Sequence, residues 1–323
     1  MTDLRDDTRR LFEAVMGREP DALWSAPGRV TLLGDLPEGV GALSLPIDRR
    51  VVVALALRDD HLIRVASTFG EHLAGLSLSE LNAAHAGGHL EGWPALPFGV
   101  AWSFGQAGAD LAAVPGVDLV IDSNIPIEAG MGSSSAVLTA VAHALHDAWH
   151  LNFSPEQIDE LVRQLDDGQP PVNDELSAAF AAALHEDELS VAVIDTGRPA
   201  EPQIYADFVL ASENDRAQDA AAALQHELRF DDLAPTIASS HLALRAAATG
   251  PLPELDLAVD TAYESGALVA RMTHRADAVV AVIPSGLVSR LQVAIDGAFA
   301  EHGFASADVH VVAPSTGATR ENL

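Results

Sequence analysis

The sequence predicts an α+β protein folded into two lobes. Segments with helical and strand-like periodicity are interleaved along the 323 residues, which is typical of this fold class. The chain is 48% hydrophobic and 20% charged, so it can bury a large core and is too apolar to remain disordered. Neither an internal repeat nor a low-complexity tract interrupts this alternation.

The first half of the chain should open with a helix, followed by strands and then by further helices. Apolar residues recur with a helical period from Leu4 to Val15, and Gly17 ends that element. In a later helix, Ser154 has the position of the N-cap and Pro155 that of the first helical residue. The strands are expected at 30–33, 51–57, 62–66 and 117–121, and the helices at 4–17, 99–107, 133–150 and 154–165.

In the second half, helical segments rich in alanine alternate with short apolar segments. The helices are expected at 175–185, 217–227, 241–248, 254–271 and 286–301, and the strands at 189–194, 204–210, 278–283 and 307–313. Because this mixture of helices and strands continues to the last residues, the whole chain is assigned to the α+β class.

The composition excludes several classes of function. The 47 acidic and 18 basic residues give a formal charge of −29, which repels nucleic acid and anionic lipid surfaces. The chain has no cysteine, which excludes disulfides, thiolate catalysis and cysteine-based metal centres. The first residues lack the apolar core of a signal peptide, and no apolar run is long enough to span a bilayer. We therefore expect a cytoplasmic monomer or homodimer without nucleic-acid or membrane partners.

A glycine- and serine-rich segment, PIEAGMGSSSAVLTAVAHAL (126–145), runs directly into a predicted helix. Glycine lets the backbone approach an anion closely, and the free amide groups of a helix N-terminus carry partial positive charge. The segment therefore predicts a phosphate-binding loop. It lacks the Gly-Lys-Ser/Thr ending of a Walker-type loop, and a helix cap built from glycine and serine is the alternative interpretation.

The same segment resembles the second signature of the GHMP kinases, the superfamily of galactokinase, homoserine kinase, mevalonate kinase and phosphomevalonate kinase. Pro126 and the run 130–134 match its Pro-x3-Gly-Leu-Gly-Ser-Ser pattern, with Met131 in place of leucine. The resemblance implies that the loop binds the phosphates of ATP and that Ser134 contacts Mg²⁺ or the γ-phosphate. The implied nucleotide-binding residues are Gly130, Met131, Gly132, Ser133, Ser134 and Ser135.

Two further segments resemble galactokinases at catalytic positions. APGRVTLLGD (26–35) is similar to their opening signature, Ala-Pro-Gly-Arg-Val-Asn-Leu-Ile-Gly-Glu, which implies that Arg29 neutralises charge on the transferred phosphoryl group. In the segment 170–198, Asp174 occupies the position of the aspartate that accepts the proton of the sugar hydroxyl. Taken alone, Arg29 would be a surface salt-bridge partner and Asp174 a helix N-cap.

The resemblance to galactokinases covers essentially the full length, because it also includes the segments 91–105, 253–273 and 313–320. It implies a two-lobed fold with mixed and antiparallel sheets, flanking helices and an active site in the cleft between the lobes. The N-terminal domain, with the phosphate loop, is expected at 1–170 and the C-terminal domain at 171–323. The implied activity is transfer of the γ-phosphate of ATP to a hydroxyl of galactose or a related hexose.

The chain departs from the galactokinase pattern in the sugar-binding segment. After the glycine at position 34, galactokinases continue Glu-His-Thr-Asp-Tyr, and these acidic and histidine residues hold sugar hydroxyls. This chain continues Asp-Leu-Pro-Glu-Gly, so Asp35 and Glu38 are the expected sugar-binding residues and Leu36 replaces the histidine. Losing a hydrogen-bonding side chain changes which sugar a site accepts or removes binding.

A second departure concerns the glycine-rich third signature of the family, which lies close to the nucleotide and the sugar. Here the run is THRADA (273–278), without glycine, and a strand with ordinary packing is the simplest interpretation. His274 and Arg275 could instead offer positive charge to phosphate. The alternative function is therefore a catalytically impaired galactokinase homologue with a ligand-binding or regulatory role.

Two other groups of polar residues have side chains that can bind metal ions. Asp166 and Asp167 lie upstream of the expected base, where the family has a Mg²⁺-binding glutamate, but adjacent acids in a loop are typically solvated turn residues. His143, His146 and His150 share one face of a predicted helix at spacings suited to Zn²⁺. We interpret these histidines as solvated side chains on the outer face of that helix.

Overall fold

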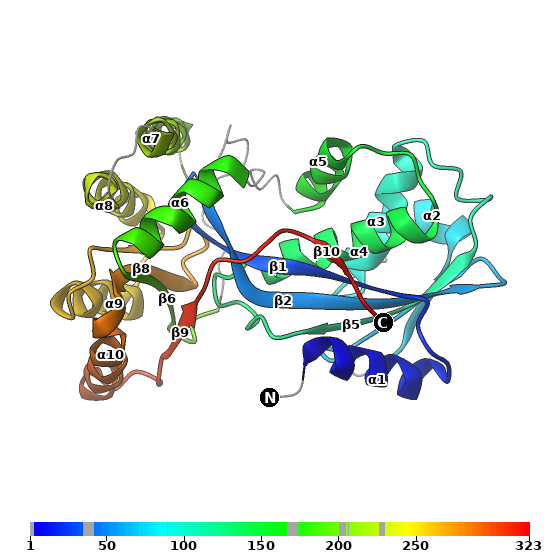
Figure 1. The fold of residues 1–323 in the computed structure, drawn as a ribbon, viewed down its shortest axis with the longest axis horizontal. Coiled ribbons are helices and arrows are strands. Elements are labelled where there is room, and N and C mark those ends of the chain that lie inside the picture. Colours follow the sequence, from blue (N-terminus) through cyan, green and yellow to red (C-terminus); the bar gives the residue numbers. More distant parts are fainter. Residues whose placement is uncertain are drawn as a thin grey trace.

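Two β-sheets form the frame of the protein, and helices pack against both (Figure 1). The computed structural model describes residues 3–34, 42–70, 72–88, 90–166, 174–199, 205, 207–225 and 230–323. One sheet has the strand order β10-β1-β2-β5-β3-β4 and the other β7-β8-β6-β9. The strands are β1 (Ala22–Leu33), β2 (Leu43–Arg58), β3 (Leu62–Ser67), β4 (Ala74–Ser77), β5 (Gly116–Ser123), β6 (Leu189–Asp195), β7 (Val269–Met272), β8 (Ala278–Pro284), β9 (Asp308–Val312) and β10 (Thr319–Glu321).

The six-stranded sheet is mixed and the four-stranded sheet is antiparallel. Strand β3 is parallel to β5, whereas β1, β2 and β5 pair in antiparallel fashion. Strand β10, near the end of the chain, pairs with β1 at the edge of the first sheet. In the second sheet, β7, β6 and β9 all run antiparallel to their neighbours. This arrangement confirms the predicted α+β fold with mixed and antiparallel sheets.

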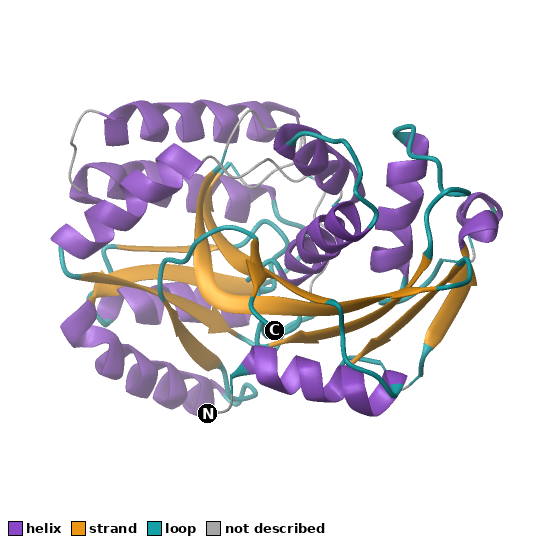
Figure 2. Ribbon diagram, turned by 45° about the vertical axis from the view of Figure 1, so that its right-hand side comes forward, coloured by secondary structure: helices purple, strands orange, loops and turns teal. Residues whose placement is uncertain are grey.

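The helices form layers on the faces of the sheets (Figure 2). Helices α3 and α4 cover one face of the six-stranded sheet and α1 covers the other (Figure 1). No helix within the described ranges combines the length and apolar character needed to cross a membrane. The helices are α1 (Leu4–Met16), α2 (Leu81–Ala86), α3 (Ala95–Gln106), α4 (Ser133–Ala148), α5 (Pro155–Leu165), α6 (Asp174–Glu186), α7 (Asp207–Gln225), α8 (Phe230–Ala247), α9 (Pro253–Glu264) and α10 (Val288–His302).

A continuous apolar core connects the two sheets. Val53 of β2, Leu145 of α4 and Val193 of β6 belong to one cluster of buried side chains. A second cluster lies between the four-stranded sheet and helices α9 and α10, and a third lies under α1. Because the largest cluster includes strands from both sheets, burial of apolar surface holds the two halves together.

Arg271 on β7 makes a polar link between the two sheets. Its side chain is buried, and its guanidinium group donates to the carbonyl oxygens of Met272, at 3.2 Å, and of Leu32 on β1. A buried charge is tolerated only when its donors are hydrogen-bonded, so these carbonyl groups are required for the packing. The contact fixes the end of β1 relative to the end of β7.

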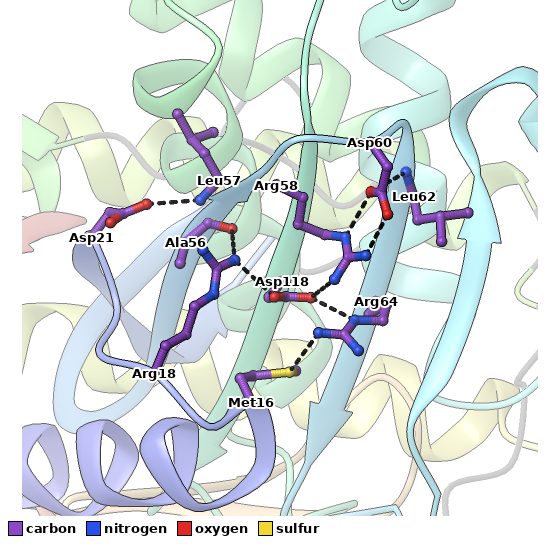
Figure 3. Close-up of polar contacts among 10 residues, drawn as sticks. All are labelled: Met16, Arg18, Asp21, Ala56, Leu57, Arg58, Asp60, Leu62, Arg64 and Asp118. Carbon is purple, nitrogen blue, oxygen red and sulfur yellow. Dashed lines mark hydrogen bonds and ion pairs between the residues drawn. The ribbon is translucent and has the colours of Figure 1, made fainter.

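A cluster of charged side chains surrounds Asp118 on the face of the six-stranded sheet that α1 covers (Figure 3). The buried carboxylate of Asp118 accepts hydrogen bonds from Arg18 at 2.8 Å, Arg58 at 3.0 Å and Arg64 at 2.7 Å. These arginines come from the turn after α1 and from strands β2 and β3. One carboxylate on β5 therefore joins three other segments of the chain.

Most expected elements are confirmed, and three expectations in the second half are wrong. The expected strand 204–210 is the start of α7 from residue 207 onward, since a short apolar run does not separate strand from helix. The expected helix 254–271 ends at Glu264, because Gly266 has a φ of +102°, and β7 follows. Residues 273–277 form a turn between β7 and β8 rather than a strand.

Candidate active site

A cavity of about 230 Å³ lies where β1, the start of α4 and the turn between β7 and β8 meet. Its lining comes from four parts of the chain that are far apart in the sequence. The lining residues are Arg29, Thr31, Ile127, Glu128, Ala129, Gly130, Met131, Gly132, Ser133, Ser134, Ser135, Asp166, Thr273, His274, Arg275 and Asp277. The predicted phosphate loop and Arg29 are thus parts of the wall of one cavity.

The loop before α4 is held against β1 by its backbone. The amide of Arg29 donates to the carbonyl oxygen of Met131 at 3.0 Å. Gly132 has a φ of +66°, and a Cβ atom there would lie 2.9 Å from Cγ of Arg29. A side chain at this position would therefore be strained and would displace Arg29. The glycine lets the loop and the arginine share one small space.

The start of α4 presents backbone amide groups to the cavity. Gly132 is the N-cap, and its lack of a side chain leaves the first turn without a side-chain cap. The residues of this turn, Ser133–Ser135, all line the cavity, and Ser134 is exposed. Free amides at a helix N-terminus favour a bound anion. The predicted helix start is confirmed, and its geometry suits a phosphate group.

Arg29 and Asp166 form an ion pair inside the cavity. Nη2 of Arg29 lies 3.6 Å from Oδ2 of Asp166, and the hydroxyl of Ser135 donates to the same carboxylate oxygen. The side chains of Arg29 and Asp166 are 15% and 14% exposed, so solvent screens the pair only partly. The interpretation of Asp166 as a solvated turn residue is therefore wrong. Asp167 lies outside the described residues.

The turn at 273–277 is closed by its own hydrogen bonds. The hydroxyl of Thr273 donates to Oδ1 of Asp277, and the amide of Thr273 donates to the carbonyl oxygen of Ala278 at 2.9 Å. Ala276 takes the left-handed conformation, with a φ of +55°. Burial raises the pKa of Asp277, against the opposing effect of the hydrogen bond from Thr273.

This turn packs directly on the phosphate loop. A Cβ atom on Gly130 would lie 2.7 Å from Cγ2 of Thr273 and 3.0 Å from Cβ of Ala278. Gly130 also has a φ of +67°, which disfavours any other residue. The segment that replaces the third glycine-rich signature therefore lies directly against the predicted phosphate loop.

Asp174 is the first residue of α6, and its side chain is not described. The first turn of this helix is connected to the cavity wall through two hydrogen bonds. The hydroxyl of Ser177 donates to the carbonyl oxygen of Ser44 at 2.7 Å, and the hydroxyls of Ser44 and Thr31 are 2.8 Å apart. Thr31 lines the cavity. The helix that begins with the expected base is thus anchored next to the site.

The expected sugar-binding residues, Asp35 and Glu38, lie outside the described residues, as does Leu36. The described end of β1 leads toward this segment. Their roles stay predictions from the sequence.

Sequence reasoning missed several residues of the cavity, namely Thr31, Ile127, Thr273 and Asp277. Thr273 and Asp277 could have been found from their spacing, because a threonine four residues before an aspartate suits a turn closed by their side chains. Thr31 carried no local signal, because its position on the wall depends on the pairing of β1 with β2.

The predicted face of histidines at 143, 146 and 150 is partly buried in the structure, with only His150 exposed. His143 stacks on Trp24 with ring centroids 5.4 Å apart, and burial, followed by the neighbouring His146, lowers the pKa of His143. The interpretation of His143 as a solvated side chain is wrong, since it is half-buried against β1. No cluster of three or more His, Cys, Asp or Glu side chains suited to a metal was found in the part of the chain that the structure describes.

Comparison with known families matches two regions of the chain. Residues 10–57 match the galactokinase galactose-binding signature, and residues 95–172 match the GHMP kinases N terminal domain. The first region contains Arg29, and the second contains the phosphate loop together with Asp166. Both matched regions therefore contribute to the cavity.

Comparison with individual proteins extends the similarity to the whole chain. A galactokinase from Streptomyces coelicolor is 27% identical over 383 residues, covering 96% of each protein. The crystal structure of Lactococcus lactis galactokinase complexed with galactose superposes with a TM-score of 0.79 at 17% identity, covering 97% of this chain and 99% of that one. Methanococcus jannaschii mevalonate kinase superposes with a TM-score of 0.65 at 15% identity, covering 91% of this chain and 98% of that one.

Proposed function

Because the chain is a galactokinase-like member of the GHMP kinase superfamily, we propose that it transfers the γ-phosphoryl group of ATP to a hydroxyl group of galactose or a related hexose. One observation carries the proposal. Arg29, the amide-rich start of α4 and the 273–277 turn line the same cavity. Phosphoryl transfer depends mainly on positioning and on neutralising charge, and this cavity offers both.

The phosphates of ATP would lie against the first turn of α4. The amides of Ser133, Ser134 and Ser135 donate to phosphate oxygens, and the partial charge of the helix N-terminus favours the negative ligand. The glycines at 130 and 132 keep Cβ atoms out of a crowded space. In a protein with a formal charge of −29, such local donors are needed to hold a polyphosphate.

Arg29 would stabilise the oxygens of the transferred phosphoryl group. Its partner Asp166, held in turn by the hydroxyl of Ser135, orients the guanidinium group toward the cavity. Asp174, at the start of α6, would accept the proton of the sugar hydroxyl as general base. Asp35 and Glu38 would bind other hydroxyls of the sugar.

The described residues also suit a magnesium ion. Mg²⁺ prefers oxygen ligands and is commonly held by one or two protein groups together with substrate phosphates. The hydroxyl of Ser134 and the carboxylate of Asp166 supply such oxygens on the wall of the cavity. When bound, the ion would neutralise charge on the phosphates during transfer.

We also propose that the site lies between an N-terminal domain, 1–170, and a C-terminal domain, 171–323. The phosphate loop belongs to the first part, whereas α6 and the 273–277 turn belong to the second. Strand β10 returns from the second part to the first sheet. With this division, residues of both domains would contact the bound substrates.

The proposed reaction is tested by measuring ADP formation from MgATP with a panel of hexoses. We expect turnover with galactose or a related hexose, and we expect Asp174→Asn to lower kcat about 10²- to 10⁴-fold, which is the usual contribution of a general base. Asp231→Asn is the matched control, since Asp231 is an exposed aspartate in the first turn of α8. Full activity of Asp174→Asn would contradict the assignment of the base.

A second candidate function, ligand binding without turnover, is favoured by the turn at 273–277, which contains no glycine. Nucleotide that binds the folded protein raises its melting temperature whether or not chemistry follows. A thermal shift with MgATP, combined with no ADP formation on any hexose, would support this candidate. Turnover that depends on Asp174 would exclude it.

A further inference from the structure

We infer that Arg275 is a second phosphate-binding cation, which acts together with Arg29 and the start of α4. The inference rests on the proposed kinase function and adds a residue that sets nucleotide affinity. It concerns the 273–277 turn, whose sequence Thr-His-Arg-Ala-Asp is the clearest departure of this chain from the proteins it resembles.

Arg275 faces the same cavity as the phosphate loop. It lines this cavity together with Ser133, Ser134 and Arg29, and its side chain is exposed. The turn that carries it touches Gly130, where an added Cβ atom would lie 2.7 Å from Thr273. A flexible arginine side chain on this turn is therefore close enough to share an anion with the start of α4.

The backbone that carries Arg275 is fixed on both sides. Thr273 and Asp277 close the turn through their side chains, and the amides of Asp277 and Ala278 lie 3.3 and 3.4 Å from the hydroxyl oxygen of Thr273. The hydroxyl of Tyr205 donates to the carbonyl oxygen of His274 at 2.8 Å. A rigid base lowers the entropy cost of positioning the guanidinium group on a ligand.

The charge of Arg275 is available to a ligand. Arg29 is already paired with Asp166, whereas Arg275 has no ion pair with a carboxylate among the residues that the structure describes. The carboxylate nearest in the chain, Asp277, is buried and accepts the hydroxyl of Thr273, and Arg275 acts on it electrostatically without forming a salt bridge. A guanidinium group binds two phosphate oxygens at once, so Arg275 and the amides of α4 would hold a phosphate from opposite sides.

The experiment measures the dissociation constants of ATP, ADP and adenosine for the full chain at low ionic strength. We expect Arg275→Ala to weaken ATP binding at least about tenfold, since losing even one charge-assisted hydrogen bond has that effect, and to leave adenosine binding unchanged. Arg275→Lys should restore part of the affinity, because lysine keeps the charge but not the two-pronged geometry. Arg290→Ala is the matched control, since Arg290 is an exposed arginine on α10 that donates to the carbonyl oxygen of Glu264.

Two results would overturn the inference alone. One is ATP binding by Arg275→Ala that equals wild type, and the other is an equal loss for ATP and adenosine, which would indicate a distorted turn rather than a lost phosphate contact. If the wild-type protein binds no nucleotide, the inference and the proposed function both fail. Nucleotide binding is measured without a sugar, so the result does not depend on turnover.

Discussion

Arginine side chains gather in two regions of this protein, and the two regions use them differently. On the face covered by α1, Arg18, Arg58 and Arg64 all donate to Asp118, as Figure 3 shows. In the cavity, Arg29 is paired with Asp166, while Arg275 lines the same space as the first turn of α4. The first region joins segments of the fold, and the second lines the cavity that we propose binds an anion.

The difference shows that a group of arginines does not by itself make an anion site. Around Asp118, the guanidinium groups are directed at a buried carboxylate, and Arg58 also binds Asp60. The cavity combines fewer arginines with backbone amides and space for a ligand. Anion binding requires donors that remain after internal hydrogen bonds are made, together with room for the anion.

The largest expected effect separates the two regions by activity. Arg29→Ala should lower kcat about 10²- to 10³-fold, because in the proposed reaction Arg29 stabilises charge that develops on the transferred phosphoryl group. Arg18→Ala is the matched control, since Arg18 is a partly exposed member of the other region. Steady-state kinetics with MgATP and the accepted hexose provide the measurement. A comparable loss in both variants would mean that the division between the regions is wrong.

The second effect separates the regions by stability. Burial opposes ionisation of Asp118, but the hydrogen bonds from Arg64, Arg18 and Arg58 outweigh burial and lower its pKa below the ordinary value of 3.8. Asp118→Asn should therefore lower the free energy of unfolding by about 2 kcal/mol, less than for a fully buried pair because the arginines are partly exposed. Urea unfolding at pH 7 measures this loss.

The pH dependence of the same variant provides a second check. A depressed pKa stabilises the fold above pH 3.8, and this contribution disappears as the pH falls through the folded-state pKa. The difference in stability between wild type and Asp118→Asn should therefore shrink below pH 3.8. Asp60→Asn, at the exposed edge of the cluster, should destabilise the protein less than Asp118→Asn does. A difference that persists in acid would point to packing rather than charge.

Arg29 and the glycine- and serine-rich loop could be singled out from the sequence because each belongs to a short motif, and the structure places both on the wall of one cavity. The serines, glycines and helix of the loop are adjacent in the chain, so their chemistry is local. Asp166 was misjudged because its partners, Arg29 and Ser135, lie far from it in sequence. Nothing in the adjacent residues distinguishes a solvated aspartate from one that the fold carries into a cavity.

The cluster around Asp118 was not predicted, for the same physical reason. Arg64 meets Asp118 only because the parallel register of β3 and β5 places these two residues opposite each other. A shift of one residue would turn either side chain to the other face of the sheet. The elements themselves were largely predictable from periodicity, whereas contacts that depend on strand register and long-range pairing were not.

The smallest expected effect contrasts Asp277 with Asp118. Both carboxyl groups are buried, but burial raises the pKa of Asp277, whereas three arginine partners together outweigh burial and lower the pKa of Asp118. Burial raises the pKa of Asp277, so folding favours its protonated form. Its contribution to stability is fully present below pH 3.8 and is lost as the pH rises through the folded-state pKa. Asparagine does not ionise, so Asp277→Asn does not lose stability as the pH rises. Its side-chain oxygen can still accept the hydroxyl of Thr273.

The stability of Asp277→Asn relative to wild type should therefore increase as the pH rises from 3.8 toward neutrality. This is the opposite direction from the Asp118 pair, in which it is wild type that gains relative to the variant as the pH rises. Urea unfolding of both pairs across pH 3 to 7 measures the two slopes. If the Asp277 pair shows no slope, or one of the same sign as the Asp118 pair, then Asp277 is ionised in the folded protein. In that case a charge next to the phosphate loop would oppose the anion that the cavity is proposed to bind.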